Sequence, residues 1–242
     1  MINTVIKPKK VLTVSVDIVD PEYIYLLIDV DVKYDSDSTI LTSGAIKTLV
    51  DQTIQTYNDN EINEFSKYFR FSKLSRLIDL SERSILNSDL SVRIRKETNV
   101  QLGVGARYVI NFSNAINSTT SGRPASHPYG TGNQLTSNAF TILGFSNCFI
   151  EDNNGIIRIY RILNGENIAV LANAGTINYT TGQVILTSFS PSAFADGGTS
   201  LKLTAVPAEK DILPLRNQII RIRDADITIT MIADNTINLV NR

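Results

Sequence analysis

Residues 11–34 contain two runs in which apolar and polar side chains alternate, and this alternation constrains the fold more than any other feature. The apolar positions are Leu12, Val14, Val16 and Ile18, then Ile24, Leu26, Ile28, Val30 and Val32. Because successive side chains of a strand point to opposite faces, each run predicts a half-buried β-strand. Pro21 lies between the runs and favours a turn. The pattern predicts an antiparallel hairpin with one face in water.

After Thr42 the spacing of apolar residues changes to that of an amphipathic helix. The stripe comprises Ile46, Leu49, Val50, Ile54 and Tyr57, and Thr42 and Ser43 are suitable caps. A second helical piece is predicted around Ile62, Phe65 and Phe69, and a third around Leu74, Leu77 and Ile78 after Ser72. Alternation returns at Leu90–Lys96. This order predicts a linker at residues 1–10 and an α+β domain over residues 11–105, in which a hairpin, helices and a strand form one unit.

Residues 106–242 have a different sequence pattern from residues 11–105, because short apolar runs alternate with Gly, Asn, Ser and Thr. The predicted strands are Arg107–Phe112, Phe140–Ile150, Ile156–Ile162, Asn167–Leu171, Thr176–Tyr179, Gln183–Thr187, Ser200–Val206, Gln218–Ile222 and Asp226–Ile232. Hairpin turns are expected at Asn153-Asn154-Gly155, Leu163-Asn164-Gly165 and Thr181-Gly182. Many short strands with such turns predict a β-rich domain, either a sandwich or a partly open barrel.

A polar loop at residues 113–138 interrupts this second domain. Loops of this length inside a compact domain are usually functional or disordered. In an assembly protein such a loop could be an arm that becomes ordered on a neighbouring subunit. Arg123, His127 and Tyr129 lie in it and are the candidate partner-binding residues.

No catalytic, metal or cofactor site is predicted. His127 is the only histidine and Cys148 the only cysteine, so a nucleophilic triad or a zinc site lacks ligands. Cys148 lies in an apolar stretch and reads as a small core residue. Asp29 and Asp31 share a strand face and could bind Ca²⁺ or act as an acid–base pair, although a solvated face explains them as well.

Charge and hydropathy exclude two classes of partner. The formal net charge is −1, which gives no excess of positive charge for a nucleic acid. No apolar run reaches the roughly 20 residues that a membrane helix needs. Arg93 with Arg95, and Arg221 with Arg223, alternate along their strands. Such faces could meet a neighbour's acidic surface, and solvated strand faces have the same pattern.

Three stretches of the first domain form a linear pattern, and they read KPKKVLTVSVDIVDPEYIYLLIDVDVKYD, GAIKTLVDQTIQTY and FRFSKLSRLIDLSERSILNSDLSVRIRKE. The most specific positions in them are Pro21-Glu22-Tyr23, Phe69-Arg70, Ser72, Leu74 and Ile78-Asp79. This pattern resembles the C-terminal part of the baseplate wedge subunit of T4-like contractile-tailed bacteriophages, and more distantly baseplate J-like proteins. The chain lacks the N-terminal half of full-length wedge subunits.

The resemblance implies a structural virion protein that needs no cofactor. It implies a ring around the tail hub that couples host attachment to sheath contraction, with assembly in the host cytoplasm. The implied partners are a second copy of the chain and other wedge proteins. Two other readings stay open: a glycan- or receptor-binding tail module, suggested by the β-rich half, and a cell-wall glycoside hydrolase using Asp29 and Asp31.

Overall fold

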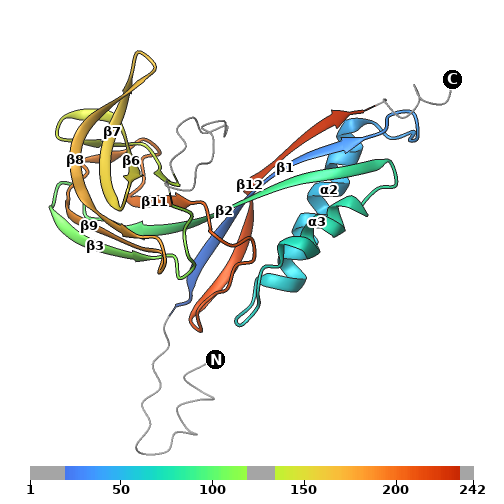
Figure 1. The fold of residues 1–242 in the computed structure, drawn as a ribbon, viewed down its shortest axis with the longest axis horizontal. Helices are drawn as coiled ribbons and strands as arrows, with labels where there is room; N and C mark the ends of the chain where they lie inside the picture. Colours follow the sequence, from blue (N-terminus) through green and yellow to red (C-terminus); the bar gives the residue numbers. More distant parts are fainter. Residues whose placement is uncertain (1–19, 119–133, 235–242) are drawn as a thin grey trace, which may run out of the picture.

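Most of the chain folds into one twelve-stranded mixed sheet with helices against one end of it (Figure 1). The computed structural model describes residues 20–118 and 134–234. The strands are β1 (Glu22–Tyr34), β2 (Ile85–Asn99), β3 (Ala106–Asn111), β4 (Leu135–Ser137), β5 (Phe140–Ile142), β6 (Phe145–Asn153), β7 (Ile156–Leu163), β8 (Glu166–Asn178), β9 (Gln183–Phe189), β10 (Ala193–Phe194), β11 (Ser200–Ala205) and β12 (Gln218–Ala233). The helices are α2 (Ser43–Tyr57), the π-helix η2 (Asn58–Ile62) and α3 (Phe71–Asp79).

The helix-covered half of the sheet is built from the three long strands β12, β1 and β2 in that order. The alternation predicted for β1 is confirmed, because Ile24, Leu26, Ile28, Val30 and Val32 are all buried. The predicted hairpin partner at residues 11–19 lies outside the described residues. β1 instead pairs with β2 on one edge, antiparallel, and with β12 on the other, parallel. Both edges of β1 are therefore occupied by strands from later in the chain.

Helices α2 and α3 cover one face of these three strands (Figure 1). The predicted stripe is confirmed in α2, where Ile46, Val50, Ile54 and Tyr57 are buried. The predicted second helix is wrong: one π-helical turn follows α2, after which residues 63–68 form bends and turns. Phe65 is 52% exposed and Phe69 fully buried, so the two do not share a helix face. The third predicted helix is α3, which buries Leu74 and Ile78.

The N-terminal cap of α2 is a specific contribution to stability. The Thr42 hydroxyl accepts a hydrogen bond from the Ala45 amide at 3.2 Å. We expect Thr42→Ala to lower the free energy of unfolding by about 1 kcal/mol, because one amide of the first turn loses its partner. Thr48→Ala, at an exposed mid-helix position, is the matched control and should change stability by less than about 0.5 kcal/mol. Urea denaturation measures both, and equal losses in the two variants would contradict the role of the cap.

The second half of the sheet is reached through β2 and curls as it continues (Figure 1). β2 pairs with β1 along residues 85–95 and with β11 along residues 94–99. From β11 the order is β4, β6, β7, β8, β9 and β3, all antiparallel. The prediction of a β-rich half is therefore confirmed, and of its two predicted forms the packed sandwich is wrong, because the strands form one continuous open sheet.

The predicted hairpin turns are confirmed between β6 and β7 and between β7 and β8. Asn154 and Gly155 have φ of 50° and 89°, and Asn164 and Gly165 have 54° and 83°, as two-residue hairpins require. Three strand limits were wrong. The run Phe140–Ile150 breaks at Leu143 and Gly144, which also have positive φ. The predicted strands Asn167–Leu171 and Thr176–Tyr179 join into β8, and Gln218–Ile222 and Asp226–Ile232 join into β12.

The strand order crosses the expected domain boundary at residue 105. β12 comes from the C-terminal end of the chain and yet pairs with β1 in the helix-covered half. Asn58 in η2 reinforces this contact, since its side-chain oxygen accepts a hydrogen bond from the Ile222 amide at 2.7 Å. The helix-covered half is therefore completed by the last of the described strands.

Candidate functional site: the junction of the two sheet halves

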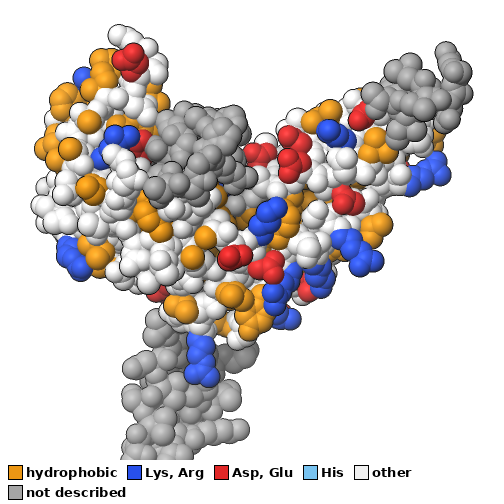
Figure 2. Space-filling view, in the orientation of Figure 1, with side chains coloured by type: hydrophobic (Ala, Val, Ile, Leu, Met, Phe, Trp, Pro, Cys, Tyr) orange, Lys and Arg blue, Asp and Glu red, His pale blue; other side chains and the backbone are white. Residues whose placement is uncertain are grey.

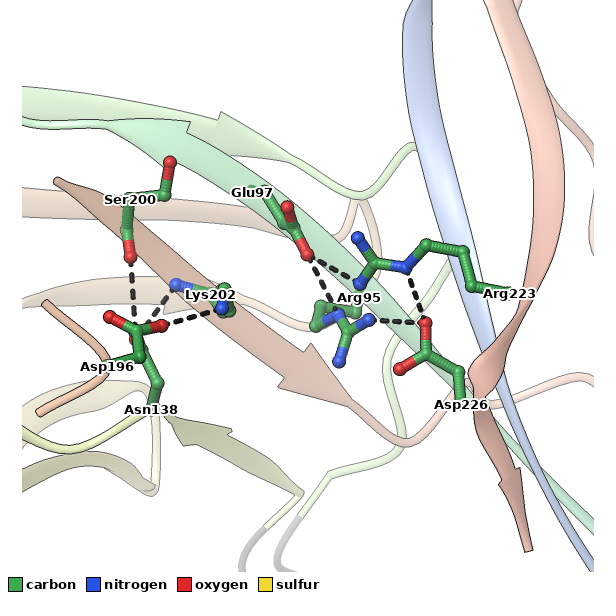
Figure 3. Close-up of polar contacts among 8 residues, drawn as sticks. All are labelled: Arg95, Glu97, Asn138, Asp196, Ser200, Lys202, Arg223 and Asp226. Atoms are coloured by element: carbon green, nitrogen blue, oxygen red, sulfur yellow. Dashed lines mark hydrogen bonds and ion pairs between the residues drawn. The ribbon is translucent and has the colours of Figure 1, made fainter. Parts of the chain in front are cut away.

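Two arginines and two carboxylates form a closed network where β2 passes from β1 to β11; we call Arg95, Glu97, Arg223 and Asp226 the junction network (Figure 3). Arg223 donates to Glu97 and to Asp226, both at 2.8 Å. Arg95 donates to Asp226 and lies 3.3 Å from Glu97. Each carboxylate meets both arginines, so the four charges cancel within the cluster.

A bulge in β12 brings this network together. Leu26 pairs with Ile222 and Ile28 with Ile227, so Leu27 alone lies opposite the four residues from Arg223 to Asp226. Bulges redirect side chains away from the regular alternation of a strand. Here the bulge carries Arg223 and Asp226 across β1 to Arg95 and Glu97 on β2.

Burial gives the junction network its energetic weight. The side chains of Asp226 and Arg95 are 6% and 12% exposed. Tyr25 of β1 lies beneath, with the guanidinium carbon of Arg223 4.0 Å from its ring centre. Burial raises the pKa of Glu97 above its usual range, and burial together with the Glu97 charge raises the pKa of Tyr25. The cluster therefore joins β1, β2 and β12 through contacts that are largely withdrawn from water.

A second group of contacts continues from the junction network into the curled half (Figure 3). Asn138 bridges to β11 with both ends of its amide, donating to the Ser200 carbonyl at 3.1 Å and accepting from the Lys202 amide at 2.9 Å. Lys202 also donates to Asp196 at 2.6 Å, which lowers the pKa of Asp196. These bonds hold β11 against the segments around it, so β2 has a fixed partner on either side of the junction.

A third cluster holds the N-terminal end of β1; we call Glu22, Lys96 and Gln218 the Glu22 cluster. Glu22 lies 3.3 Å from the Lys96 ammonium and accepts a hydrogen bond from Gln218 at 3.1 Å. The Gln218 contact lowers the pKa of Glu22, and burial lowers the pKa of Lys96. Glu22, Lys96 and Gln218 lie on β1, β2 and β12, so this cluster ties together the same three strands as the junction network.

The Phe69-Arg70 pair attaches the helical layer to the C-terminal segment. Phe69 forms an antiparallel bridge with Ile212, and its ring meets Tyr57 edge-on at 6.0 Å. Arg70 donates to Asp211 at 2.8 Å, and the Phe71 amide donates to the other Asp211 oxygen at 2.9 Å. Asp79 plays a similar part by accepting from Ser88 on β2. The conspicuous sequence motif thus serves packing and strand attachment.

The Asp211 contacts predict a pH-dependent contribution to stability. Two hydrogen bonds lower the pKa of Asp211, and the bond from Arg70 has a larger effect than the bond from the Phe71 amide. A carboxylate with a lowered folded pKa stabilises the fold above its unfolded pKa and loses this effect as the pH falls through the folded value. We expect Asp211→Asn to lower the free energy of unfolding by at most about 1 kcal/mol at neutral pH, because the Arg70–Asp211 ion pair is partly exposed. Below about pH 4 the difference between the variant and the original protein should be smaller. Urea denaturation at several pH values tests this, and a difference that grows on acidification would contradict it.

The structure shows where the residues considered for metal or nucleophilic chemistry lie. Within residues 20–118 and 134–234, no three His, Cys, Asp or Glu side chains are grouped to hold a metal ion. Cys148 is fully buried, and burial raises the pKa of its thiol, which confirms it as a core residue. Asp29 and Asp31 lie on the strand face opposite Ile28 and Val30, and Asp31 is exposed. No helix in the described residues, α2 and α3 included, is long and apolar enough to cross a membrane.

The predicted partner-binding residues Arg123, His127 and Tyr129 lie outside the described residues. The described flanks of their loop meet at one place beside β11. The Asn117 amide donates to the Val206 carbonyl, and the Val206 amide donates to the Gln134 carbonyl, both at 2.9 Å. Buried Asp152 holds the returning end by accepting from the Gln134 and Leu135 amides. The loop thus leaves and rejoins the sheet next to the junction.

Sequence reasoning missed the junction network. Arg95 and Arg223 were considered as faces for an acidic neighbour or for water, and the structure places both against carboxylates of the same chain. A local clue exists, since Glu97 and Asp226 follow their arginines by two and three residues. The pairing of β12 with β1 was needed to bring the two pieces together.

Comparison with known proteins finds a family similar to most of the helix-covered half. Residues 22–97 match the family model described as baseplate structural protein gp6, C-terminal domain III. A search of the curated proteins finds no match. The matched range begins at β1 and ends in β2, and so contains both helices, Phe69-Arg70 and half of the junction network. Residues 22–97 are therefore similar to a domain of a phage baseplate structural protein, which supports the resemblance to the T4-like baseplate wedge subunit.

Proposed function

We propose that the chain is a non-catalytic building block of the baseplate wedge. In this role it forms part of the ring around the tail hub, through self-association and through contacts with other wedge proteins. The ring couples host attachment to sheath contraction. Assembly takes place in the host cytoplasm before the tail is complete. The observation that carries the proposal is the match of residues 22–97 to a baseplate structural domain.

The described contacts support a mechanical role. The junction network and the Glu22 cluster each tie β1, β2 and β12 together, and Asn138 ties β11 to the adjoining loop. A subunit that transmits force between neighbours needs its two ends coupled, since a flexible link would absorb the movement. Packed strands joined by buried ion pairs meet this need, because they have few alternative arrangements.

Co-expression with the other wedge proteins of the same phage tests the proposal. The chain, carrying an affinity tag, should retain at least one wedge protein at a fixed stoichiometry through size-exclusion chromatography. A tagged chain that binds none of them, and that binds defined glycans saturably on an array, would instead support a receptor-binding tail module.

A further inference from the structure

Three large apolar side chains stand in water near the start of β1; we call Tyr68, Leu213 and Leu215 the ribbon patch. They are 48%, 51% and 53% exposed. The antiparallel bridge between Phe69 and Ile212 joins their two segments, and both bridging side chains are fully buried. Because side chains alternate between the two faces of such a ribbon, Tyr68 and Leu213 point together to its outer face. Both segments lie at the lower end of the molecule in Figure 1, where β1 begins, and hydrophobic side chains gather on the surface there (Figure 2).

The backbone that carries the two leucines is firmly anchored. The Asn114 side chain donates to the Leu213 carbonyl at 3.1 Å and accepts from the Leu213 amide at 3.0 Å. The Leu215 amide donates to the Gln218 side chain at 3.1 Å, and the Leu215 carbonyl accepts from the Gln218 amide at 3.0 Å. The exposure of the leucines therefore follows from a fixed backbone and not from a loose loop. Apolar side chains gathered in one place on a surface are typical of an interaction site.

The ribbon patch adjoins the point at which residues 11–19 join the described fold. The Glu22 amide at the start of β1 donates to the Asn217 carbonyl at 3.0 Å, and Asn217 lies two residues after Leu215. Val19 precedes Glu22 by three residues. An extended segment as long as residues 11–19 spans about 30 Å. The segment can therefore reach the patch of its own chain.

Residues 11–19 also carry an apolar face that β1 does not cover. The alternation of the sequence predicts one apolar side of the segment, formed by Leu12, Val14, Val16 and Ile18. The hairpin partner predicted for it is β1, and from Tyr25 to Tyr34 both edges of β1 are paired with other strands. The apolar side of the segment thus needs a different surface to leave water, and the ribbon patch is an apolar surface within its reach.

We propose that residues 11–19 dock in extended form across the ribbon patch of the same chain, with their apolar side against Tyr68, Leu213 and Leu215. Side chains on one side of an extended segment recur about every 7 Å, so this side presents a row of apolar groups to the patch. Attachment through residues 20–22 makes the association intramolecular, which raises the effective concentration of the segment at the patch. Docking fixes the direction in which residues 1–10 leave the fold.

The reactivity of an introduced thiol tests which side of the segment is covered. Cys148 is fully buried, so a thiol reagent reports on the introduced cysteine in the folded chain. The Val16→Cys thiol should react at least about tenfold more slowly than the Ser15→Cys thiol, because docking shields the apolar side from the reagent. The two variants should react at similar rates in urea. Equal rates in the folded chain would overturn the proposal.

A charge placed on the patch tests whether this surface provides the shielding. Adding Leu213→Glu to the Val16→Cys chain should raise the thiol reactivity to that of Ser15→Cys, because a carboxylate opposes apolar docking. The fold should persist, since Asn114 binds only the backbone of Leu213, and circular dichroism checks this. Ile162→Glu is the matched control, because Ile162 is 53% exposed on β7, and it should leave the slow reaction unchanged. A thiol that stays protected in the Leu213→Glu chain contradicts the assignment of the patch.

Cross-linking identifies the occupant directly. Val16→Cys combined with Leu213→Cys should form a disulfide within one chain under mild oxidation, because docking brings these side chains together. Val16→Cys combined with Ile162→Cys should form none. A disulfide between two chains in place of one within a chain would assign the patch to a neighbouring copy and overturn the proposal. The baseplate role is tested separately by the binding of wedge proteins and does not depend on this result.

Discussion

Replacing Phe69 with alanine should lower the free energy of unfolding by about 3–5 kcal/mol, the range for removing a large aromatic side chain from a core. Phe69 is fully buried against Tyr57, and its backbone pairs with Ile212. The truncation therefore opens a cavity at the point where the helical layer meets the C-terminal segment. Chemical denaturation followed by tryptophan-independent signals, such as circular dichroism, suits this chain because it contains no tryptophan.

Phe65→Ala is the matched control for this experiment. Phe65 is 52% exposed and belongs to the irregular segment after η2, although its spacing from Phe69 suggested one shared helix face. Its truncation should cost less than about 1 kcal/mol, since most of the ring already contacts water. Similar losses from the two variants would show that residues 62–69 form the regular helix that the sequence pattern suggested.

Replacing Asp226 with alanine should cost about 2–3 kcal/mol, near the lower end of the range for breaking a buried ion pair. The variant leaves Arg95 and Arg223 side by side without the carboxylate that both contact, and Arg95 is 12% exposed. Arg223 is 33% exposed, so water screens part of the loss. Urea denaturation at neutral pH measures the effect.

Asp224→Ala provides the comparison on the same bulge. Asp224 is exposed and lies two residues from Asp226. Its removal should change stability by less than about 0.5 kcal/mol, as for surface substitutions in general. If Asp226→Ala is equally mild, the junction network adds nothing to the coupling of β2 with β12, and rigidity must come from backbone pairing and apolar packing alone.

The sequence predicts elements whose pattern is local. The stripe from Ile46 to Tyr57 specifies α2 because four of its five members fall on one buried face. The alternation in β1 and the Asn-Gly turns at Asn154 and Asn164 work in the same way, since each depends on only a few neighbouring residues. The family pattern around Phe69-Arg70 also lies in one continuous stretch, which is why the resemblance could be recognised and why the family model supports it.

What the sequence does not show is the pairing between distant segments. Glu22 and Gln218 are partners across almost the entire chain. The bulge at residues 223–226 interrupts the alternation of β12, so its two parts resembled separate short strands of the second domain. The same bulge produces the junction network. The π-helical turn after α2 was also missed, because a single turn of this kind has no distinct periodicity, and it rotates Phe65 away from the core.

These pairings extend the helix-covered half beyond the residues that the family model matches. Residues 22–97 supply β1, β2 and the helices, and β12 adds the third strand from residues 218–233. Ile229 of β12 is 7% exposed and belongs to the same core as Ile28 and Val30. The curled half is therefore inserted between parts of one structural unit, with β2 continuing directly into it.

Quantitative mass spectrometry of purified virions tests the central claim of a structural baseplate subunit most directly. The chain should be present in intact particles, remain with the baseplates after tails are dissociated, and occur in a constant ratio to the other wedge proteins. Its absence from purified particles, in a lysate that contains the chain, would contradict the account.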